Sequence, residues 1–333
     1  MSRMKVNHTV VTEFILLGLS SDPAQQKLLF SLVLLIYLLT LVGNLAIMTL
    51  ICVDRCLQTP MYFLLGNLSF IEICYTSSTV PKMLWNLMSG DRTISFTGCA
   101  LQMYFFVTLG GTECVLLSAM AYDRYAAICH PLRYTVLMSQ PTCKGLLTVS
   151  WTVGNFNSII NTALVFSLDF CNSNQIEHFF CDIPPLLHLS CSDTRLSKLV
   201  TFTVSGCGIT LSFFLTLLSY IFIVFTVLKI RTSQGRIKAF STCASHLTVV
   251  SIFYGTIIFT YLTPSSSHST EQEQLVSVLY AIITPLLNPL IYSFRNKDVQ
   301  SALRRILLQL LNLDLQMKRC IQCSSYVELS LWA

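Results

Sequence analysis

Long apolar stretches separated by short polar segments recur along most of the chain. Each is roughly 20 residues or longer, the length that a helix needs to cross about 30 Å of hydrocarbon. The pattern predicts an all-α membrane protein, a bundle of seven transmembrane helices. The approximate bounds are 28–52, 61–84, 100–120 with a helical continuation, 145–168, 199–228, 239–262 and 274–294.

The fourth stretch is the most polar of the seven. Asn155, Asn157 and Asn161 interrupt its apolar pattern. Amides at helical spacing can face neighbouring helices inside a bundle, so the stretch is still interpreted as a span.

Composition supports the membrane assignment. Of 333 residues, 53% are hydrophobic and 11% are charged, and the mean hydropathy is +0.64. A soluble globular protein carries more charge than this. The net charge of +5 is explained by membrane sidedness, so no nucleic-acid partner is expected.

The basic residues predict the orientation, because Lys and Arg accumulate in cytoplasmic loops. With the amino terminus outside, 14 of the 21 Lys and Arg residues fall on the cytoplasmic side. Asn7, followed by His8 and Thr9, forms a glycosylation acceptor, which functions only on the outer face. No conventional signal peptide precedes it, so we expect the first span to act as the targeting signal.

Four of the 14 cysteines lie on the predicted outer side, where oxidation is permitted. They are Cys99, Cys171, Cys181 and Cys191. Four cysteines allow three connectivities, and we expect Cys99 to pair with Cys181 and Cys171 with Cys191. The first bond would tie the third span to the long loop before the fifth. The alternative is a metal site that also uses His178 and His188.

The third apolar stretch ends in MAYDRYAAICHPLRY, residues 120–134, which places an acid and a base side by side. In the simplest interpretation, the positive charge of Arg124 is favourable at the carboxyl end of a helix, and its long side chain extends to the membrane interface. The neighbouring residues support a more specific interpretation.

Six blocks together resemble the olfactory receptors, within the G-protein-coupled receptors of the rhodopsin type. They occur in order and on the appropriate sides of the membrane. The blocks are Gly43 with Asn44, PMYFLLGNLSF (60–70), MAYDRYAAICHPLRY (120–134), Ser219 with Tyr220, KAFSTCASHL (238–247) and PLLNPLIYSFRN (285–296).

The resemblance implies a switch in which Asp123 holds Arg124 at rest and releases it towards a G protein on activation. Such a switch requires a desolvated charge pair and two helix packings of similar energy. Tyr254 would convey ligand contact to the sixth span, and Pro285 would help to kink the seventh. The implied coupling and switch residues are Asp123, Arg124, Tyr125, Tyr220, Lys238, Thr242, Cys243, Tyr254, Asn288, Pro289 and Tyr292.

Two carboxylates, Glu72 and Glu113, lie inside otherwise apolar spans. Charges at that depth are costly, which makes both residues functional candidates that face polar groups, protons or a small cation. The alternative is a pair of protonated, hydrogen-bonded acids that pack the core. Family members usually carry Asp at the position of Glu72.

Ligand recognition is expected between the third, fifth, sixth and seventh spans, in a mostly apolar pocket suited to a small volatile compound. Helical counting from Arg124 supplies the third-span residues, and the resemblance supplies the others. No acid stands in the outer third span, which argues against a charged amine. The expected contacts are Phe106, Val107, Gly110, Gly111, Val204, Ser205, Gly208, Ile209, Ile257, Ile258, Tyr261 and Val278.

Residues after the last span predict an amphipathic helix on the inner leaflet, because apolar side chains recur there at helical spacing. The expected organisation is an outer segment (1–27), a receptor domain (28–294), this helix (295–311) and a cytoplasmic tail (312–333). Cys320 and Cys323 in the tail are free thiols or palmitoylation sites.

The expected function is that of an odorant receptor in the plasma membrane, which activates a stimulatory, olfactory-type G protein and raises cyclic AMP. The alternative is a rhodopsin-like receptor for a non-odorant hydrophobic ligand, or an olfactory-type receptor that works in another tissue. No enzyme motif and no internal repeat typical of a carrier is found, and no cofactor is expected.

Overall fold

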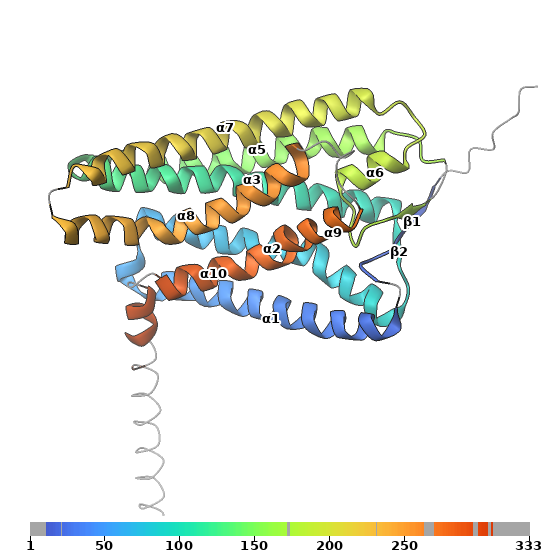
Figure 1. The fold of residues 1–333 in the computed structure, drawn as a ribbon, viewed down its shortest axis with the longest axis horizontal. Helices are drawn as coiled ribbons and strands as arrows, with labels where there is room; N and C mark the ends of the chain where they lie inside the picture. The colour runs from blue at the N-terminus through green and yellow to red at the C-terminus, as the bar shows by residue number, and fades with distance from the viewer. Residues whose placement is uncertain are drawn as a thin grey trace, which may run out of the picture.

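Seven long helical segments lie side by side within the described residues of the computed structural model, as the hydrophobic pattern predicted (Figure 1). The structure describes residues 11–20, 22–171, 174–230, 232–262, 270–295, 299–305 and 308. The first six segments are α1 (Pro23–Val53), α2 (Pro60–Ser89), α3 (Phe96–Cys129), α5 (Gln140–Phe166), α7 (Arg195–Leu228) and α8 (Ser233–Leu262). The seventh consists of α9 (Thr270–Val278), a π-helical turn (Leu279–Ile283) and α10 (Thr284–Arg295).

The helices extend past the apolar stretches, because capping residues set their ends while hydropathy marks only the part in hydrocarbon. The Asp22 carboxylate accepts a hydrogen bond from the Ala24 N–H, and α1 then begins at Pro23. Ser95 caps α3 in the same way. Short helices connect the long ones: Arg55–Leu57, Pro131–Arg133, α4 (Tyr134–Leu137) and α6 (Ile183–Leu189).

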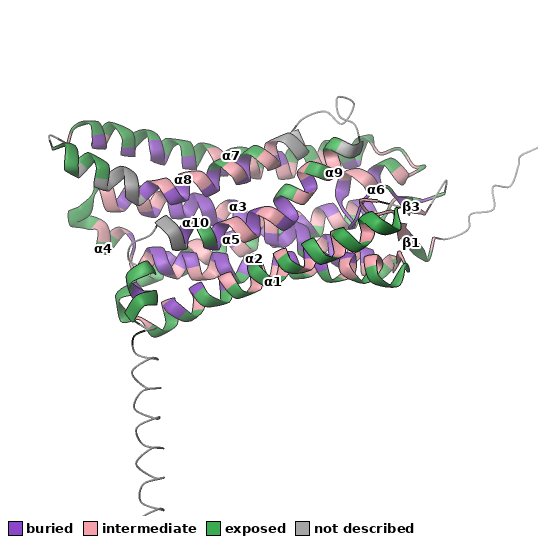
Figure 2. Cartoon of the chain, turned by 60° about the horizontal axis from the view of Figure 1, so that its bottom comes forward, coloured by how far each residue is buried: buried purple, intermediate pink, exposed green. Residues whose placement is uncertain are grey.

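Four helices in the described part of the chain are long and apolar enough to cross a membrane individually: Pro23–Val53, Phe96–Cys129, Arg195–Leu228 and Gln272–Tyr292. Helix α5 is more polar than these four, and its asparagine amides form hydrogen bonds with neighbouring helices, as the sequence suggested. Asn155 accepts a hydrogen bond from the Tyr104 hydroxyl at 2.7 Å. Figure 2 shows exposed residues along α1 and α7 and mostly buried residues in α3, which therefore forms the centre of the bundle.

The π-helical turn in the seventh segment has a local cause. The Thr284 N–H donates to Leu279 O, five residues earlier, and the Thr284 hydroxyl bonds to the same oxygen at 3.0 Å. Pro285 follows and has no N–H to donate, so the regular ladder is interrupted at this point. The break lies one turn before Asn288, where the sequence predicted a kink.

A three-stranded sheet at one end of the bundle, called the sheet end below, was not anticipated. Strand β1 (Glu13–Leu16) pairs antiparallel with β2 (Thr93–Ser95) and parallel with β3 (Gln175–Ile176). Phe14 is fully buried, and its ring lies 5.9 Å from Phe96 and 5.3 Å from Phe170. The strands are short and far apart in sequence, so no local pattern marked them.

A helical segment at residues 299–305 follows α10 at the opposite end of the bundle (Figure 1). Val299 and Ala302 are buried, and the Arg305 guanidinium bonds to the Asp54 carboxylate at 2.6 Å. This ion pair holds the pKa of Asp54 below its usual range. The rest of the expected amphipathic helix, the tail with Cys320 and Cys323, and Asn7 lie outside the described residues.

Candidate functional site

A cavity of about 260 Å³ lies within the bundle among α3, α5, α7 and α8. Its wall is mostly apolar, and its polar side chains are Asn157, Ser205 and the hydroxyl-bearing Tyr75 and Tyr280. The lining residues are Tyr75, Phe106, Val107, Gly110, Gly111, Cys114, Val115, Val153, Phe156, Asn157, Ile183, Val204, Ser205, Gly208, Ile209, Ile257 and Tyr280. Concave, mostly apolar sites with a few placed polar groups are typical of small-molecule binding.

The structure brings nine of the twelve expected ligand contacts to this cavity. They are Phe106, Val107, Gly110, Gly111, Val204, Ser205, Gly208, Ile209 and Ile257. Ile258 and Val278 are partly buried against the hydrophobic core and do not line it. The side chain of Tyr261, in α8, lies outside the described residues.

Helix α5 contributes lining residues that the sequence interpretation missed, namely Val153, Phe156 and Asn157. The asparagines of this span had been assigned to helix packing. Their spacing was a usable signal, because polar side chains that face the bundle can also face a cavity within it. Tyr75, Ile183 and Tyr280 were also missed, and they come from three separate elements.

Aromatic rings form the wall of the cavity towards the sheet end. Phe106 stacks on Tyr75 with ring centroids 4.6 Å apart, and it lies 4.6 Å from Phe180 and 5.9 Å from Tyr280. Phe180 is fully buried although it belongs to the loop between α5 and α7. That loop therefore plugs the bundle above the cavity.

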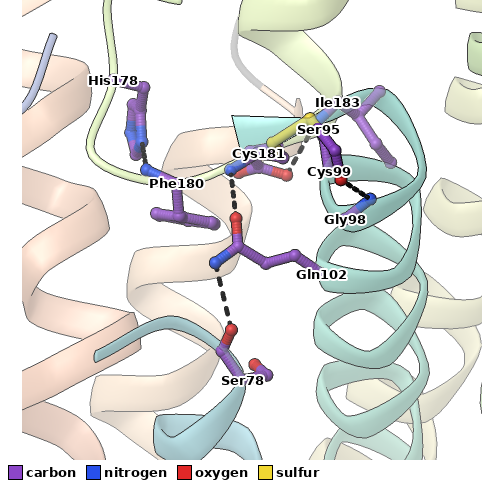
Figure 3. Close-up of a disulfide and its surroundings, with 10 residues drawn as sticks. Ser78, Ser95, Gly98, Cys99, Gln102, His178, Phe180, Cys181 and Ile183 are labelled. Carbon is purple, nitrogen blue, oxygen red and sulfur yellow. Dashed lines mark hydrogen bonds between the residues drawn. A yellow bond between two sulfur atoms is a disulfide. The ribbon is translucent and has the colours of Figure 1, made fainter. Parts of the chain in front are cut away.

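Two disulfides hold the plugging loop, and both pairs are those expected from the sequence. Cys99 joins Cys181 with Cα atoms 5.5 Å apart, and Cys171 joins Cys191 at 5.9 Å. Figure 3 shows Gln102 beside the first bond: its Oε1 accepts from the Cys181 N–H at 2.9 Å, and its Nε2 donates to Ser78 O at 3.1 Å. One side chain of α3 thus ties the loop to α2.

His178 joins the plugging loop to the seventh segment. Its Nδ1 accepts from the Phe180 N–H at 3.4 Å, as Figure 3 shows, and its Nε2 lies 3.0 Å from the Ser277 hydroxyl. These contacts and the disulfides leave no metal site here, and no cluster of metal-ligating residues occurs elsewhere in the described part of the chain. The structure therefore supports the disulfide interpretation, with His178 as a hydrogen-bonding residue.

We expect acid to destabilise the folded protein through His178. Burial lowers the pKa of this imidazole from 6.5 to about 3. The unfolded chain takes up the proton first, so this contribution is fully present above pH 6.5 and is lost as the pH falls towards 3. Going from pH 7.5 to 5 should cost about 2 kcal/mol.

The measurement is thermal unfolding of the protein in lipid nanodiscs across this pH range. His178→Gln keeps a donor for Ser277 and should flatten the dependence, while His188→Gln in the same loop, where the side chain is exposed, should not. An equal slope in the His178→Gln protein would contradict the assignment.

Asp123 and Arg124 form an ion pair at the end of the bundle opposite the sheet. Arg124 bonds to Asp123 Oδ2 through Nε at 3.0 Å and Nη2 at 2.5 Å, and the Asp123 side chain is fully buried. The Tyr134 hydroxyl donates to Asp123 Oδ1 at 2.7 Å. Tyr134 ends the MAYDRYAAICHPLRY stretch but was not singled out as a partner.

Helices α3, α7 and α8 are packed together near this ion pair. The Tyr220 hydroxyl lies 2.6 Å from His246 Nδ1, and His246 Nε2 lies 3.1 Å from Leu117 O. Cys243 packs in a cluster with Tyr220 and Ala121. His246 was missed by the sequence interpretation, although it lies in the KAFSTCASHL block.

The other expected switch residues are spread along the bundle. Tyr125 bonds to His130, Tyr254 donates to Cys114 O at 3.1 Å, and Tyr292 is buried. A Cβ added at Gly43 would lie 3.1 Å from Pro289 Cγ, so α1 and α10 approach each other closely at Pro289. Lys238 and Thr242 belong to α8, and their side chains lie outside the described residues.

The two buried acids meet in the centre of the bundle. Asn288 donates to Glu72 Oε1, and the Glu113 carboxyl is a near neighbour of Glu72. Glu72 Oε2, Glu113 Oε1, Asn288 Oδ1 and the Tyr292 hydroxyl have no hydrogen-bond partner among the described residues. Adjacent carboxylates repel one another, so this cluster requires a proton or a cation.

The seven helical segments and the loop that covers the cavity define the class of fold as that of rhodopsin. The structure superposes on squid rhodopsin with a TM-score of 0.66 over 88% of each chain, at 17% sequence identity. A sequence profile of the olfactory receptors matches residues 33–310. The chain belongs to the olfactory receptor family.

Individual relatives agree with that assignment. Olfactory receptor 5AP2 of Mus musculus is 55% identical over 301 residues, which is 90% of this chain and 95% of the relative. Olfactory receptor 5AP2 of Homo sapiens is 54% identical over 90% of this chain and 95% of its own. Olfactory receptor 5B21 of Mus musculus is 53% identical over 90% and 94%. The family expected from the six sequence blocks is confirmed.

Proposed function

We propose that this receptor binds a small, mostly apolar odorant in the cavity and activates a stimulatory, olfactory-type G protein, which raises cyclic AMP. The observation that carries the proposal is the mostly apolar cavity among α3, α5, α7 and α8 of an olfactory receptor bundle. A wall of aromatic and aliphatic side chains favours ligands held by dispersion and by loss of contact with water.

Signalling then requires that the ligand bind the active packing more tightly than the resting one. We infer that Tyr254 couples the cavity to the Arg124 end of the bundle, because it donates to Cys114 O and Cys114 lines the cavity. Further along α3, Asp123 holds Arg124, and Tyr220, Cys243 and His246 close the helices together. Opening this end would create a groove for an amphipathic helix of the G protein.

The proposed orientation places the sheet end outside the plasma membrane and Arg124 in contact with the cytoplasm. The excess of basic residues in the loops at the Arg124 end supports it. The two disulfides at the sheet end also support it, because disulfides persist in an oxidising compartment. In this orientation Asn7 is available for glycosylation.

Filling the cavity should lower agonist potency. A Cβ added at Gly208 would meet nothing within 4 Å, so Gly208→Leu adds a side chain without a backbone clash. We expect at least a tenfold higher agonist concentration for half-maximal cyclic AMP, because the ligand loses about 1.4 kcal/mol or more of packing. Cells that express the receptor with the olfactory G protein are tested against a broad volatile panel.

Cys207→Leu is the matched control, because Cys207 precedes Gly208 on α7 but is exposed and does not line the cavity. Surface display is measured for both variants. If Gly208→Leu is displayed and responds as the wild type does, the cavity is not the ligand site. If well-displayed wild-type receptor raises no cyclic AMP with any volatile, the alternative of a non-odorant hydrophobic ligand replaces the proposal.

A further inference from the structure

We propose that Asn157 is a ligand-binding residue whose side-chain amide donates a hydrogen bond to an acceptor oxygen on the ligand. The receptor would then be selective for carbonyl compounds such as aldehydes, ketones and esters over hydrocarbons of the same skeleton. This inference rests on the proposed function of the cavity and specifies the ligand class.

A cluster of three polar side chains fixes the orientation of the Asn157 amide. The Ser205 hydroxyl donates to Asn157 Oδ1 at 2.8 Å, and Asn161 Nδ2 donates to the same oxygen at 3.0 Å. Asn161 Nδ2 also donates to the backbone oxygen of Asn157 at 2.8 Å. A backbone carbonyl only accepts hydrogen bonds, so the Asn161 atom is the nitrogen and its side-chain partner on Asn157 is the oxygen.

This assignment leaves the two N–H groups of Asn157 Nδ2 for another partner. No oxygen of a described residue accepts a hydrogen bond from Asn157 Nδ2, and Asn157 lines the cavity. Asn157 Nδ2 lies 3.8 Å from the position that a Cβ on Gly111 would occupy, and Gly111 also lines the cavity. A side chain at Gly111 would crowd the Asn157 amide and also Gly154 Cα, which lies 3.1 Å from the same position.

The rest of the cavity wall leaves the Asn157 amide as the group that selects between ligands with and without an acceptor oxygen. Ser205 is the other polar side chain that lines the cavity on this side, and its hydroxyl is already donated to Asn157. Ser205 thus acts as a positioning residue rather than as the ligand contact expected from the sequence. A hydrocarbon ligand would leave Asn157 Nδ2 unpaired in a desolvated site, whereas an acceptor oxygen would satisfy it.

The lining residues that the structure describes include no carboxylate, so an amine gains no ion pair from them. A carboxylic acid would have to lose its hydration for one neutral amide, since the described lining includes no Lys or Arg either. Neutral acceptors are therefore the ligand class that the cavity fits.

The test compares direct binding of matched ligands to the full-length receptor in lipid nanodiscs. Thermal stabilisation is titrated with the unbranched aldehydes from propanal to decanal and with the alkane of the same chain length. A ligand that binds the folded state raises its stability according to its affinity and concentration, so the titration yields a Kd without signalling. We expect the best aldehyde to bind about tenfold more tightly than its alkane.

Asn157→Leu should bring the ratio of the two Kd values close to one, because both ligands then meet an apolar wall. Differences in partitioning between the two ligands are the same in both proteins and cancel in this comparison. Asn155→Leu is the matched control, because it also removes an amide from α5. The Asn155 amide bonds to Tyr104 and does not line the cavity. It should keep the wild-type ratio.

An unchanged ratio in Asn157→Leu, a wild-type receptor that binds alkanes as tightly as aldehydes, or one that binds no aldehyde would each overturn the inference. Cyclic AMP is recorded with the same ligands in cells to separate the two proposals. Selective binding without a cyclic AMP response would leave the role of Asn157 intact and reject the proposed signalling.

Discussion

Gly154→Ala is expected to destabilise the receptor by about 3 kcal/mol, a large effect for one methyl group. A Cβ at position 154 would lie 2.3 Å from Thr112 Oγ1, 2.5 Å from Thr108 O and 2.8 Å from Thr112 N. Two of these atoms belong to the backbone of α3 and cannot turn aside as a side chain could. Helices α3 and α5 would therefore have to separate.

Separation would break the hydrogen bonds that depend on this close approach. The Ser158 hydroxyl donates to Tyr104 O at 2.6 Å, and the Tyr104 hydroxyl donates to Asn155. The measurement is thermal unfolding in nanodiscs together with surface display in cells. Gly145→Ala on the same helix is the control, because its Cβ would meet nothing within 4 Å, and it should be neutral or slightly stabilising. Equal stability of the two variants would show that α3 and α5 are not closely packed at Gly154.

Arg124→Ala is expected to abolish the agonist response, and Asp123→Asn to raise cyclic AMP without agonist. In the proposed mechanism the released Arg124 side chain contacts the G protein, and Asp123 withholds it at rest. Asn keeps the shape of Asp123 but not its charge, which weakens the two hydrogen bonds from Arg124. A buried pair that loses one partner typically costs about 3–5 kcal/mol, enough to change which packing predominates.

Tyr134→Phe gives a graded test of the same switch. It removes one of the three hydrogen bonds to the Asp123 carboxylate and leaves both bonds from Arg124. Basal cyclic AMP should therefore lie between those of the wild type and Asp123→Asn. Arg133→Ala, at an exposed position of the same loop, is the control for loss of a nearby positive charge and should leave signalling unchanged. A full agonist response from a displayed Arg124→Ala receptor would reject the mechanism.

The sequence alone determined the number and approximate position of the spans, because burial in hydrocarbon demands long apolar helices whatever their neighbours are. Six motif blocks were sufficient to assign the family. The observed helix ends differ by several residues from the ends of the apolar stretches, since caps such as Asp22 and Ser95 lie in polar sequence. Both disulfide pairs also matched the expectation, since the outer cysteines were few and the predicted topology separated them from the others.

Only the tertiary structure decided which side chains meet across the bundle. Hydropathy shows that Asn157 is polar but not that its amide is oriented by Ser205, a residue 48 positions away in sequence. The same holds for Tyr134 on Asp123, His246 between Tyr220 and Leu117, and strand β1 beside β3. Each of these contacts depends on the rotation and spacing of whole helices, which periodicity along one segment does not specify. The chain thus encodes its spans locally and the contacts between its helices through packing.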